Sequence, residues 1–288
     1  MNQFDRPIEP QDWPQKVKKV QTRLRQRIVK SPQRPLSKKA IPPLWRDSKV
    51  TFMQRNGDKL TVKEIFSQAQ NGLCGYCAVN LIPTGTGELD HYRPARSIKR
   101  QIWIPGEEMG SGISRVKGRR LRPNPPHRPG FWDEAYSWSN YVFCCERCNV
   151  AWKRDLCVSE LNGKPHLGER DPQEKSLLLN PFEKVDTSLH LEFYGAGLVK
   201  GKTGRGRATI QTCGLDRPSL VTDRVMFVEL AELHCKNIQG CTDKTKLRDC
   251  YKKLVARGSW KNAHALVVRQ TAERKLGVPW SVIEKRAK

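Results

Sequence analysis

The sequence predicts an α+β fold with a zinc-stabilised core, a basic N-terminal helical extension and a mostly α-helical C-terminal region. Three observations support this. Two Cys-x-x-Cys pairs bracket the middle of the chain, apolar residues recur at helical spacing near the N-terminus, and helical spacing returns after Pro218. We therefore expect three parts, at residues 1–72, 73–160 and 161–288.

Charge and length restrict the function. The chain has 288 residues and a formal net charge of +24, which predicts a polyanionic partner, nucleic acid first and an anionic membrane surface second. No stretch approaches the roughly 18 apolar residues of a membrane span, and the N-terminus lacks the apolar segment of a secretory signal. We expect a cytoplasmic protein without a membrane partner, whose ten cysteines are more typical of metal binding than of disulfides.

The first 50 residues contain 13 Lys and Arg against 4 Asp and Glu. Val17, Val20, Leu24 and Ile28 recur at helical spacing, and the other faces are almost all Lys, Arg and Gln. This pattern predicts a helix between Asp12 and Lys30. Its basic surface could lie along phosphates or could be a solvated face at the edge of the core, and the sequence favours neither. A Pro-rich linker is expected over 31–45.

Two further regions have regular patterns. Thr61 and Glu64 form a capping-box pair that predicts a short helix closed by Asn71 and Gly72. Alternation at Leu189, Leu191 and Phe193 predicts a strand, with a turn at Gly195 and Gly197. Helices are then expected from Pro218 and over the segments Lys244–Arg257, Lys261–Lys275 and Pro279–Lys288.

A long basic insert spans 93–130. It holds ten Lys and Arg against two acids, and Gly and Pro interrupt it. Loops of this length are usually functional or disordered, so we expect nucleic-acid contact here, with a solvated insertion as the alternative. The candidate nucleic-acid-binding residues are Arg93, Arg96, Lys99, Arg100, Arg119, Arg120 and Arg122.

The cysteine pairs are Cys74/Cys77 and Cys145/Cys148, separated by 67 residues. Each can form a knuckle, and four thiolates around one Zn²⁺ make a structural site because no position stays open for substrate. Cys144 could compete, but only Cys145 gives the two-residue gap. The alternative is two independent buried or redox-active pairs, although neither has the βαβ setting of a redox motif.

A set of polar residues lies around these pairs: Asp90-His91 between them, Asn140 just before the second, and Asn149 and Lys153 just after it. Phosphodiester hydrolysis needs a base, a cation near the phosphate and stabilisation of the leaving oxygen. A histidine can be the base. Asp90 and Asn149 are hard oxygen ligands suited to Mg²⁺ or Mn²⁺. Lys153 lies four residues beyond Asn149 on the same helix face, and we expect it to be directed toward the phosphate.

In this order of motifs the chain resembles the HNH (ββα-metal) endonuclease family. The resemblance implies that His91 is the general base, that Asp90 and Asn149 bind the catalytic metal, and that Asn140 braces the loop and orients His91. Asn149 stands where many members have a final His, which favours Mg²⁺ over a softer metal. Adjacent strand residues point to opposite faces, so Asp90 and His91 can serve one site only if the backbone bends or one acts through the strand edge.

A looser resemblance covers about residues 73–225. The stretches Asn180-Pro181-Phe182, His190–Phe193, Ala208-Thr209-Ile210 and Gly214–Arg217 are similar to the HNH nucleases paired with an ABC-type ATPase in Septu and related retron anti-phage systems. This implies a defence nuclease, DNA favoured, whose activity an ATPase partner sets.

Two other interpretations stay open. A non-catalytic zinc-stabilised nucleic-acid-binding module would explain every basic feature, but it does not require Asp90, His91 and Asn149. An interaction subunit could instead be silent until its ATPase binds. Taken one at a time, Asp90-His91 could be a surface pair, Asn140 a turn residue and Asn149 a helix cap.

Overall fold

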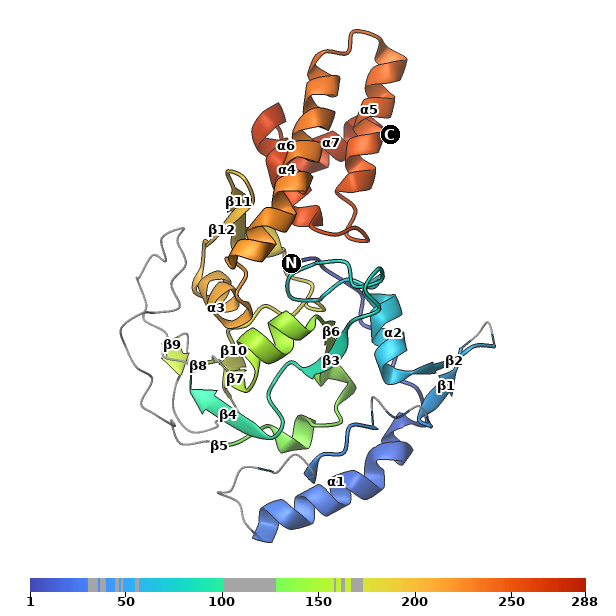
Figure 1. Cartoon of the computed structure of the whole chain (residues 1–288), viewed down its shortest axis with the longest axis vertical. Helices are drawn as coiled ribbons and strands as arrows, with labels where there is room; N and C mark the ends of the chain where they lie inside the picture. The colour runs from blue at the N-terminus through green and yellow to red at the C-terminus, as the bar shows by residue number, and fades with distance from the viewer. Residues whose placement is uncertain are drawn as a thin grey trace.

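The computed structural model describes residues 1–30, 36, 40–44, 47, 49–54, 57–100, 128–157, 159–161, 164–166 and 173–288. Most of the predicted linker over 31–45 and most of the insert over 93–130 lie outside these residues. Helices and strands are mixed, as predicted. The C-terminal helices stand at one end of the molecule and α1 at the other (Figure 1).

The helix α1 (Trp13–Lys30) confirms the predicted N-terminal helix. It buries only Trp13, Val17 and Leu24. The Trp13 indole donates a hydrogen bond to the Tyr136 carbonyl at 3.0 Å and packs edge-on against the Trp138 ring, with centroids 5.8 Å apart. One fully buried aromatic side chain therefore anchors a helix whose remaining surface is mostly basic and exposed.

The predicted capping box is present at α2 (Val62–Ala69). Thr61 accepts from the Glu64 backbone N–H, and Glu64 accepts from the Thr61 backbone N–H at 2.7 Å. The chain leaves this helix through Asn71 (φ 53°) and Gly72 (φ 68°). A Cβ on Gly72 would lie 2.2 Å from the Ile82 side chain, so glycine is needed there both for its conformation and for its close packing.

The centre of the molecule is an antiparallel pair, β3 (Glu88–His91) and β6 (Tyr141–Cys144), which pairs Asp90 with Val142 and His91 with Tyr141. A π-helix, η5 (Arg147–Lys153), follows β6 after two residues. Its wider hydrogen bonding ends with the Arg154 N–H donating to the Asn149 carbonyl at 2.7 Å. Two strands and a helical segment thus surround the Cys-x-x-Cys pairs.

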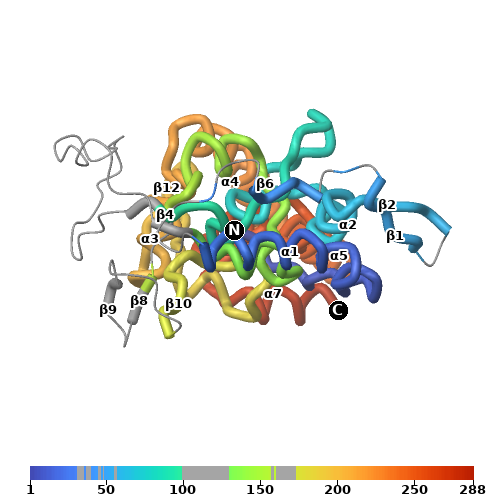
Figure 2. The backbone as a smooth tube through the Cα atoms, turned by 90° about the horizontal axis from the view of Figure 1, so that it is seen from below, coloured from blue at the N-terminus to red at the C-terminus, as the bar shows by residue number. Residues whose placement is uncertain are grey.

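The remaining strands are short and lie around this centre. They are β1 (Thr51–Met53), β2 (Lys59–Thr61), β4 (Ser97–Arg100), β5 (Arg128–Pro129), β7 (Leu156–Cys157), β8 (Ser159–Leu161), β9 (Lys164–His166), β10 (Lys175–Ser176), β11 (Leu191–Tyr194) and β12 (Leu198–Gly201). The β1–β2 hairpin projects on one side of the molecule, and β12 with α3 (Gly204–Cys213) lies on the opposite side (Figure 2).

Two predicted elements begin later in the chain than the sequence indicated. The strand predicted from Leu189 begins at Leu191, because Asp186 caps a 3₁₀ turn over Thr187–Leu189 through the Ser188 N–H. The helix predicted over Lys261–Lys275 is α6 (Ala265–Leu276), because His264 adopts a left-handed conformation (φ 50°) immediately before it.

The other C-terminal helices follow the prediction closely: α4 (Pro218–Gln239), α5 (Lys244–Arg257) and α7 (Trp280–Ala287). They enclose an apolar cluster of their own around Cys235, Leu254 and Ile283, separate from the main core. Every helix in the described part of the chain is too short or too polar to cross a membrane.

Candidate metal centre and active site

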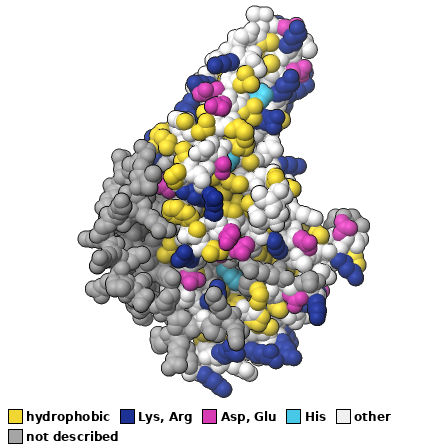
Figure 3. Space-filling view, viewed as in Figure 1, with side chains coloured by type: hydrophobic (Ala, Val, Ile, Leu, Met, Phe, Trp, Pro, Cys, Tyr) yellow, Lys and Arg dark blue, Asp and Glu magenta, His cyan; other side chains and the backbone are white. Residues whose placement is uncertain are grey.

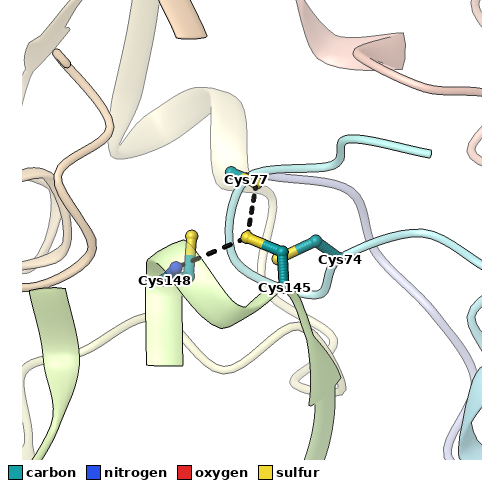
Figure 4. Close-up of side chains that lie close together, drawn as sticks. All are labelled: Cys74, Cys77, Cys145 and Cys148. Atoms are coloured by element: carbon teal, nitrogen blue, oxygen red, sulfur yellow. Dashed lines mark hydrogen bonds between the residues drawn. The ribbon is translucent and has the colours of Figure 1, made fainter. Parts of the chain in front are cut away.

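The four predicted cysteines converge. The Sγ atoms of Cys74, Cys77, Cys145 and Cys148 all lie within 4.8 Å of one another, and those of Cys77 and Cys145 are 3.8 Å apart (Figure 4). They come from the loop after α2 and from the junction of β6 with η5. The cluster has the donor set of a structural zinc site, so these residues fit Zn²⁺.

The second knuckle uses Cys145 and not Cys144, as the spacing predicted. Cys144 is the last residue of β6, and its buried side chain lies outside the sulfur cluster. Burial raises the pKa of the Cys144 thiol well above its ordinary value, and the nearby Asp90 carboxylate adds to this. A thiol held neutral in this way is a poor metal ligand.

Arg217 lies beside the sulfur cluster, and the sequence analysis did not identify it as a site residue. Its Nη1 contacts the Cys148 Sγ at 3.6 Å and donates to the carbonyls of Cys213 and Gly214 at 3.1 and 3.0 Å. Burial alone would lower the pKa of Arg217, but the thiolates of Cys148 and Cys77 outweigh it and raise the pKa. Four thiolates around Zn²⁺ carry two net negative charges, which this guanidinium partly offsets. In the sequence, the feature that could have pointed to Arg217 is its place at the end of the Gly214–Arg217 stretch, which belongs to the looser resemblance.

Asp90 lies inside the protein at the third position of β3. Its Oδ2 accepts from the Tyr76 hydroxyl at 2.8 Å and pairs with the Lys153 ammonium at 2.9 Å. Tyr76 lies between the two cysteines of the first knuckle, so the sulfur cluster and Asp90 are linked by one buried side chain.

Lys153 contacts both residues of the Asp-His motif. The Nζ atom pairs with the Asp90 carboxylate and donates to the His91 carbonyl at 2.7 Å, and the side chain is fully buried. The ammonium therefore fixes the end of η5 against β3.

His91 points to a different set of partners. The Nε2 atom is 2.8 Å from the Ala135 carbonyl, and the imidazole lies against the Tyr141 ring with centroids 5.5 Å apart. Because a carbonyl oxygen only accepts, Nε2 carries the proton and the neutral ring has its lone pair on Nδ1. Burial lowers the pKa of His91 to about 4, although the Ala135 hydrogen bond opposes this shift.

Asn140 fastens the chain that leaves β3. Its Oδ1 accepts from the Arg93 N–H at 2.7 Å, and its Nδ2 donates to the carbonyls of Arg93 and Glu134 at 3.0 and 3.1 Å. The Asn140 carbonyl also accepts from the Tyr92 N–H at 2.7 Å. Asn140 therefore binds both N–H and carbonyl groups of the loop after His91.

Asn149 also faces β3, but its partner is Glu88. The Asn149 Nδ2 donates to Glu88 Oε2 at 2.7 Å. Glu88 and Asp90 lie on one face of the strand, two residues apart, so Asn149 and Lys153 bind successive acids on that face. Glu88 is a residue that the sequence analysis did not select.

These contacts do not assemble a hard-cation site. The Asp90 carboxylate is bound to Lys153, and the Asn149 Nδ2 is bound to Glu88. Among the described residues, the four cysteines are the only group of three or more His, Cys, Asp and Glu residues placed to hold a metal ion. Asp90 and Asn149 offer the oxygen donors that Mg²⁺ prefers, without the arrangement that would hold it.

The structure describes four of the seven predicted nucleic-acid-binding residues. Arg93 pairs with Glu174 (3.6 Å) and stacks on Phe131, and the Arg96 carbonyl accepts backbone hydrogen bonds. Lys99 and Arg100 belong to β4. Three candidates, Arg119, Arg120 and Arg122, lie outside the described residues.

Comparisons with known proteins found one clear relative. Over 192 residues, 65% of this chain, the sequence is 30% identical to the Septu protein PtuB of Bacillus mycoides (strain KBAB4). The chain spans 57% of that relative's length. No family model and no solved structure matches the chain.

Proposed function

We propose that this chain is a metal-dependent HNH-type endonuclease that hydrolyses phosphodiester bonds of nucleic acid, with DNA the favoured substrate. The single observation that carries the proposal is that the two cysteine knuckles meet beside β3. There Lys153 binds the Asp90 carboxylate and the His91 carbonyl, and Asn140 holds the backbone just after His91. The similarity to a Septu protein supports a role in anti-phage defence.

His91 is the general base in this proposal. Because Nε2 donates to the Ala135 carbonyl, the proposal assigns the proton transfer to Nδ1. Burial lowers the pKa of His91 to about 4, so the ring is neutral at neutral pH. Asn140 is a positioning residue, because it holds the backbone immediately after His91.

Lys153 is a second positioning residue. The sequence prediction that Lys153 is directed toward the phosphate is wrong, because its ammonium is buried and bound by Asp90 and the His91 carbonyl. Its role in this proposal is to set β3 against η5. The proposal keeps a requirement for Mg²⁺ or Mn²⁺, but Asp90 and Asn149, bound here to Lys153 and Glu88, do not form the site that would hold the ion. Zn²⁺ on the four cysteines would hold the scaffold.

The basic surface of α1 supplies sequence-independent phosphate contacts in this proposal. Exposed Lys18, Lys19 and Arg23 lie on this helix with little acid nearby, and Lys and Arg side chains gather at that end of the molecule (Figure 3). Binding through such contacts weakens steeply with salt.

A plasmid-nicking assay tests the proposal. With Mg²⁺ or Mn²⁺ the chain should nick DNA, and EDTA should stop the reaction. His91→Ala should lose about 10²–10⁴-fold in rate while keeping its zinc content and DNA affinity. His234→Ala, on the distant α4 helix, is the matched control and should cleave normally. Unchanged cleavage by His91→Ala contradicts the assignment of the base.

A second candidate is a non-catalytic zinc-stabilised nucleic-acid-binding or interaction subunit. The mutual neutralisation of Asp90 and Lys153 inside the protein favours it. We further propose an ABC-type ATPase as partner, which would be recovered by co-purification from the native operon. Nicking that appears only with that partner supports a regulated nuclease, whereas DNA binding without nicking under either condition supports the second candidate.

A further inference from the structure

A polar cleft of about 510 Å³ opens beside the loop that follows His91. Its lining comes from segments far apart in the sequence, including Arg6 before α1, Arg93 after β3, Lys175 in β10 and Arg205 in α3. The volume lies within the range of about 300–1,000 Å³ that is typical of small-molecule sites.

Basic side chains outnumber acidic ones in this lining. Arg6, Arg93, Lys175 and Arg205 stand against Glu134 and Glu183. The Arg205–Glu183 pair, at 2.5 Å, satisfies one of these acids. The cleft therefore keeps an excess of positive charge.

Two of the four cations, Arg6 and Lys175, form no ion pair with a carboxylate among the described residues. Lys175 is exposed and forms no ion pair with them. Arg6 donates to the carbonyls of Trp138 and Tyr141 at 3.0 and 3.4 Å, and its guanidinium lies 4.3 Å from the centroid of the Phe182 ring. Burial lowers the pKa of Arg6 to about 10, so the group is still charged at neutral pH. Carbonyls orient this charge, and Glu183, which forms its ion pair with Arg205, is the nearby carboxylate that partly offsets it.

Arg205 has an unsatisfied donor in addition to its ion pair. Its Nε is buried and has no hydrogen-bond partner in the described part of the chain. A buried donor without an acceptor is costly, and a guanidinium presents its N–H groups in a fork that matches two oxygens of a phosphate or carboxylate.

We propose that this cleft binds the phosphate of a nucleotide, with the arginines and Lys175 contacting the phosphate. Ser139 and Ser176, which also line the cleft, offer hydroxyls for the sugar or base. The phosphate chemistry follows from the lining alone. The choice of a nucleotide rests on the proposed nuclease function, because Asn140 clamps Arg93, two residues after His91, at the cleft wall. The nucleotide is either free or one unit of a single strand.

Equilibrium binding tests the cleft without any cleavage assay. The zinc-loaded full chain is titrated with adenosine 5′-monophosphate, with adenosine, and with a short single-stranded DNA oligonucleotide. Lys175→Gln and Arg6→Gln each remove one charge from the lining. Lys184→Gln is the matched control, because Lys184 is exposed, close in sequence and not part of the cleft. His91→Ala is titrated in parallel.

Charge-assisted hydrogen bonds predict a loss of about tenfold or more in affinity for each cleft variant, with Lys184→Gln unchanged and adenosine binding much more weakly than its monophosphate. Loss of monophosphate binding in the cleft variants indicates a free nucleotide, and loss of oligonucleotide binding alone indicates a nucleotide within a strand. If neither ligand distinguishes the cleft variants from Lys184→Gln, the proposal is wrong. If the wild type does not nick DNA with or without its partner, while wild type and His91→Ala both bind the ligands normally, the nuclease proposal is wrong and the cleft proposal stands.

Discussion

The buried Lys153–Asp90 pair makes a quantitative prediction. Lys153→Met keeps the length and most of the volume of the side chain but removes its charge. The Lys153 side chain is 0% exposed and that of Asp90 is 8% exposed, and the ammonium also satisfies the His91 carbonyl. Among the described residues, the variant would leave the buried Asp90 carboxylate with only the Tyr76 hydroxyl as partner.

Removing one member of a buried ion pair costs about 3–5 kcal/mol. We expect Lys153→Met to lower the free energy of unfolding by that amount, a large fraction of the roughly 5–15 kcal/mol that holds a domain folded. Adding Asp90→Asn removes the stranded charge, so the double variant should recover most of the loss.

Urea denaturation of the zinc-loaded protein measures these differences through the transition midpoint. Lys252→Met is the matched control. It breaks an exposed pair with Asp249 (3.5 Å, side chains 54% and 58% exposed), which should cost less than about 1 kcal/mol. If Lys153→Met costs no more than Lys252→Met, or if the double variant is as unstable as Lys153→Met, the buried pair does not hold η5 against β3.

Three further predictions concern the zinc ligands, the hydrogen bonds of Asn140 and the pH dependence of stability. Cys145→Ser should lose bound zinc and folded protein together, while Cys144→Ser keeps both, as elemental analysis and circular dichroism would show; equal zinc loss in both variants would contradict the assignment of Cys145. Asn140→Ala should lower the free energy of unfolding by about 1–3 kcal/mol, because it leaves the Arg93 N–H and carbonyl without their side-chain partner. Unchanged stability in urea would show that Asn140 does not hold this loop. Burial lowers the pKa of His264 from 6.5 to about 3, so below about pH 6.5 the unfolded state binds the proton first and this residue costs about 2 kcal/mol of stability by pH 5. His264→Asn, which tolerates the left-handed backbone, should be less acid-sensitive than wild type in parallel urea titrations at pH 7 and 5, and an identical pH dependence would count against this explanation.

The sequence predicted the elements that local patterns encode. Apolar spacing and end signals marked α1, α2 and the C-terminal helices, and the gap between Cys145 and Cys148 selected the cysteine that joins the cluster. These features depend on residues close together in the chain, so a single sequence contains the needed information.

The helix α3 shows where local patterns mislead. Gly204 and Gly206 disfavour a helix, and none was predicted over 204–213. The structure forms one because Thr203 caps it and because α3 packs closely against the segment before β11, where a Cβ on Gly206 would lie 2.0 Å from the His190 carbonyl. Glycine here permits a tertiary contact, which no pattern within ten residues encodes.

The same limit applies to the candidate site. The polar residues around the knuckles could be selected from their order, but their partners could not. Glu88 binds Asn149, and Arg217 reaches the sulfur cluster from a position 69 residues beyond Cys148. Both contacts depend on how η5, α3 and α4 pack, which the sequence alone does not give.

The sulfur cluster and the Asp90–Lys153 pair form one unit through short connections. Tyr76, between Cys74 and Cys77, donates directly to Asp90, and Lys153 ends the helical segment that begins beside Cys145 and contains Cys148. The two buried charges at Asp90 and Lys153 are favourable only while both contacts persist, since an unpaired charge in this interior would cost several kcal/mol. Since η5 carries both Cys148 and Lys153, a shift of the cysteines moves the ammonium away from the carboxylate. The geometry of the metal centre is therefore transmitted to the Asp-His motif by two side chains and one helical segment.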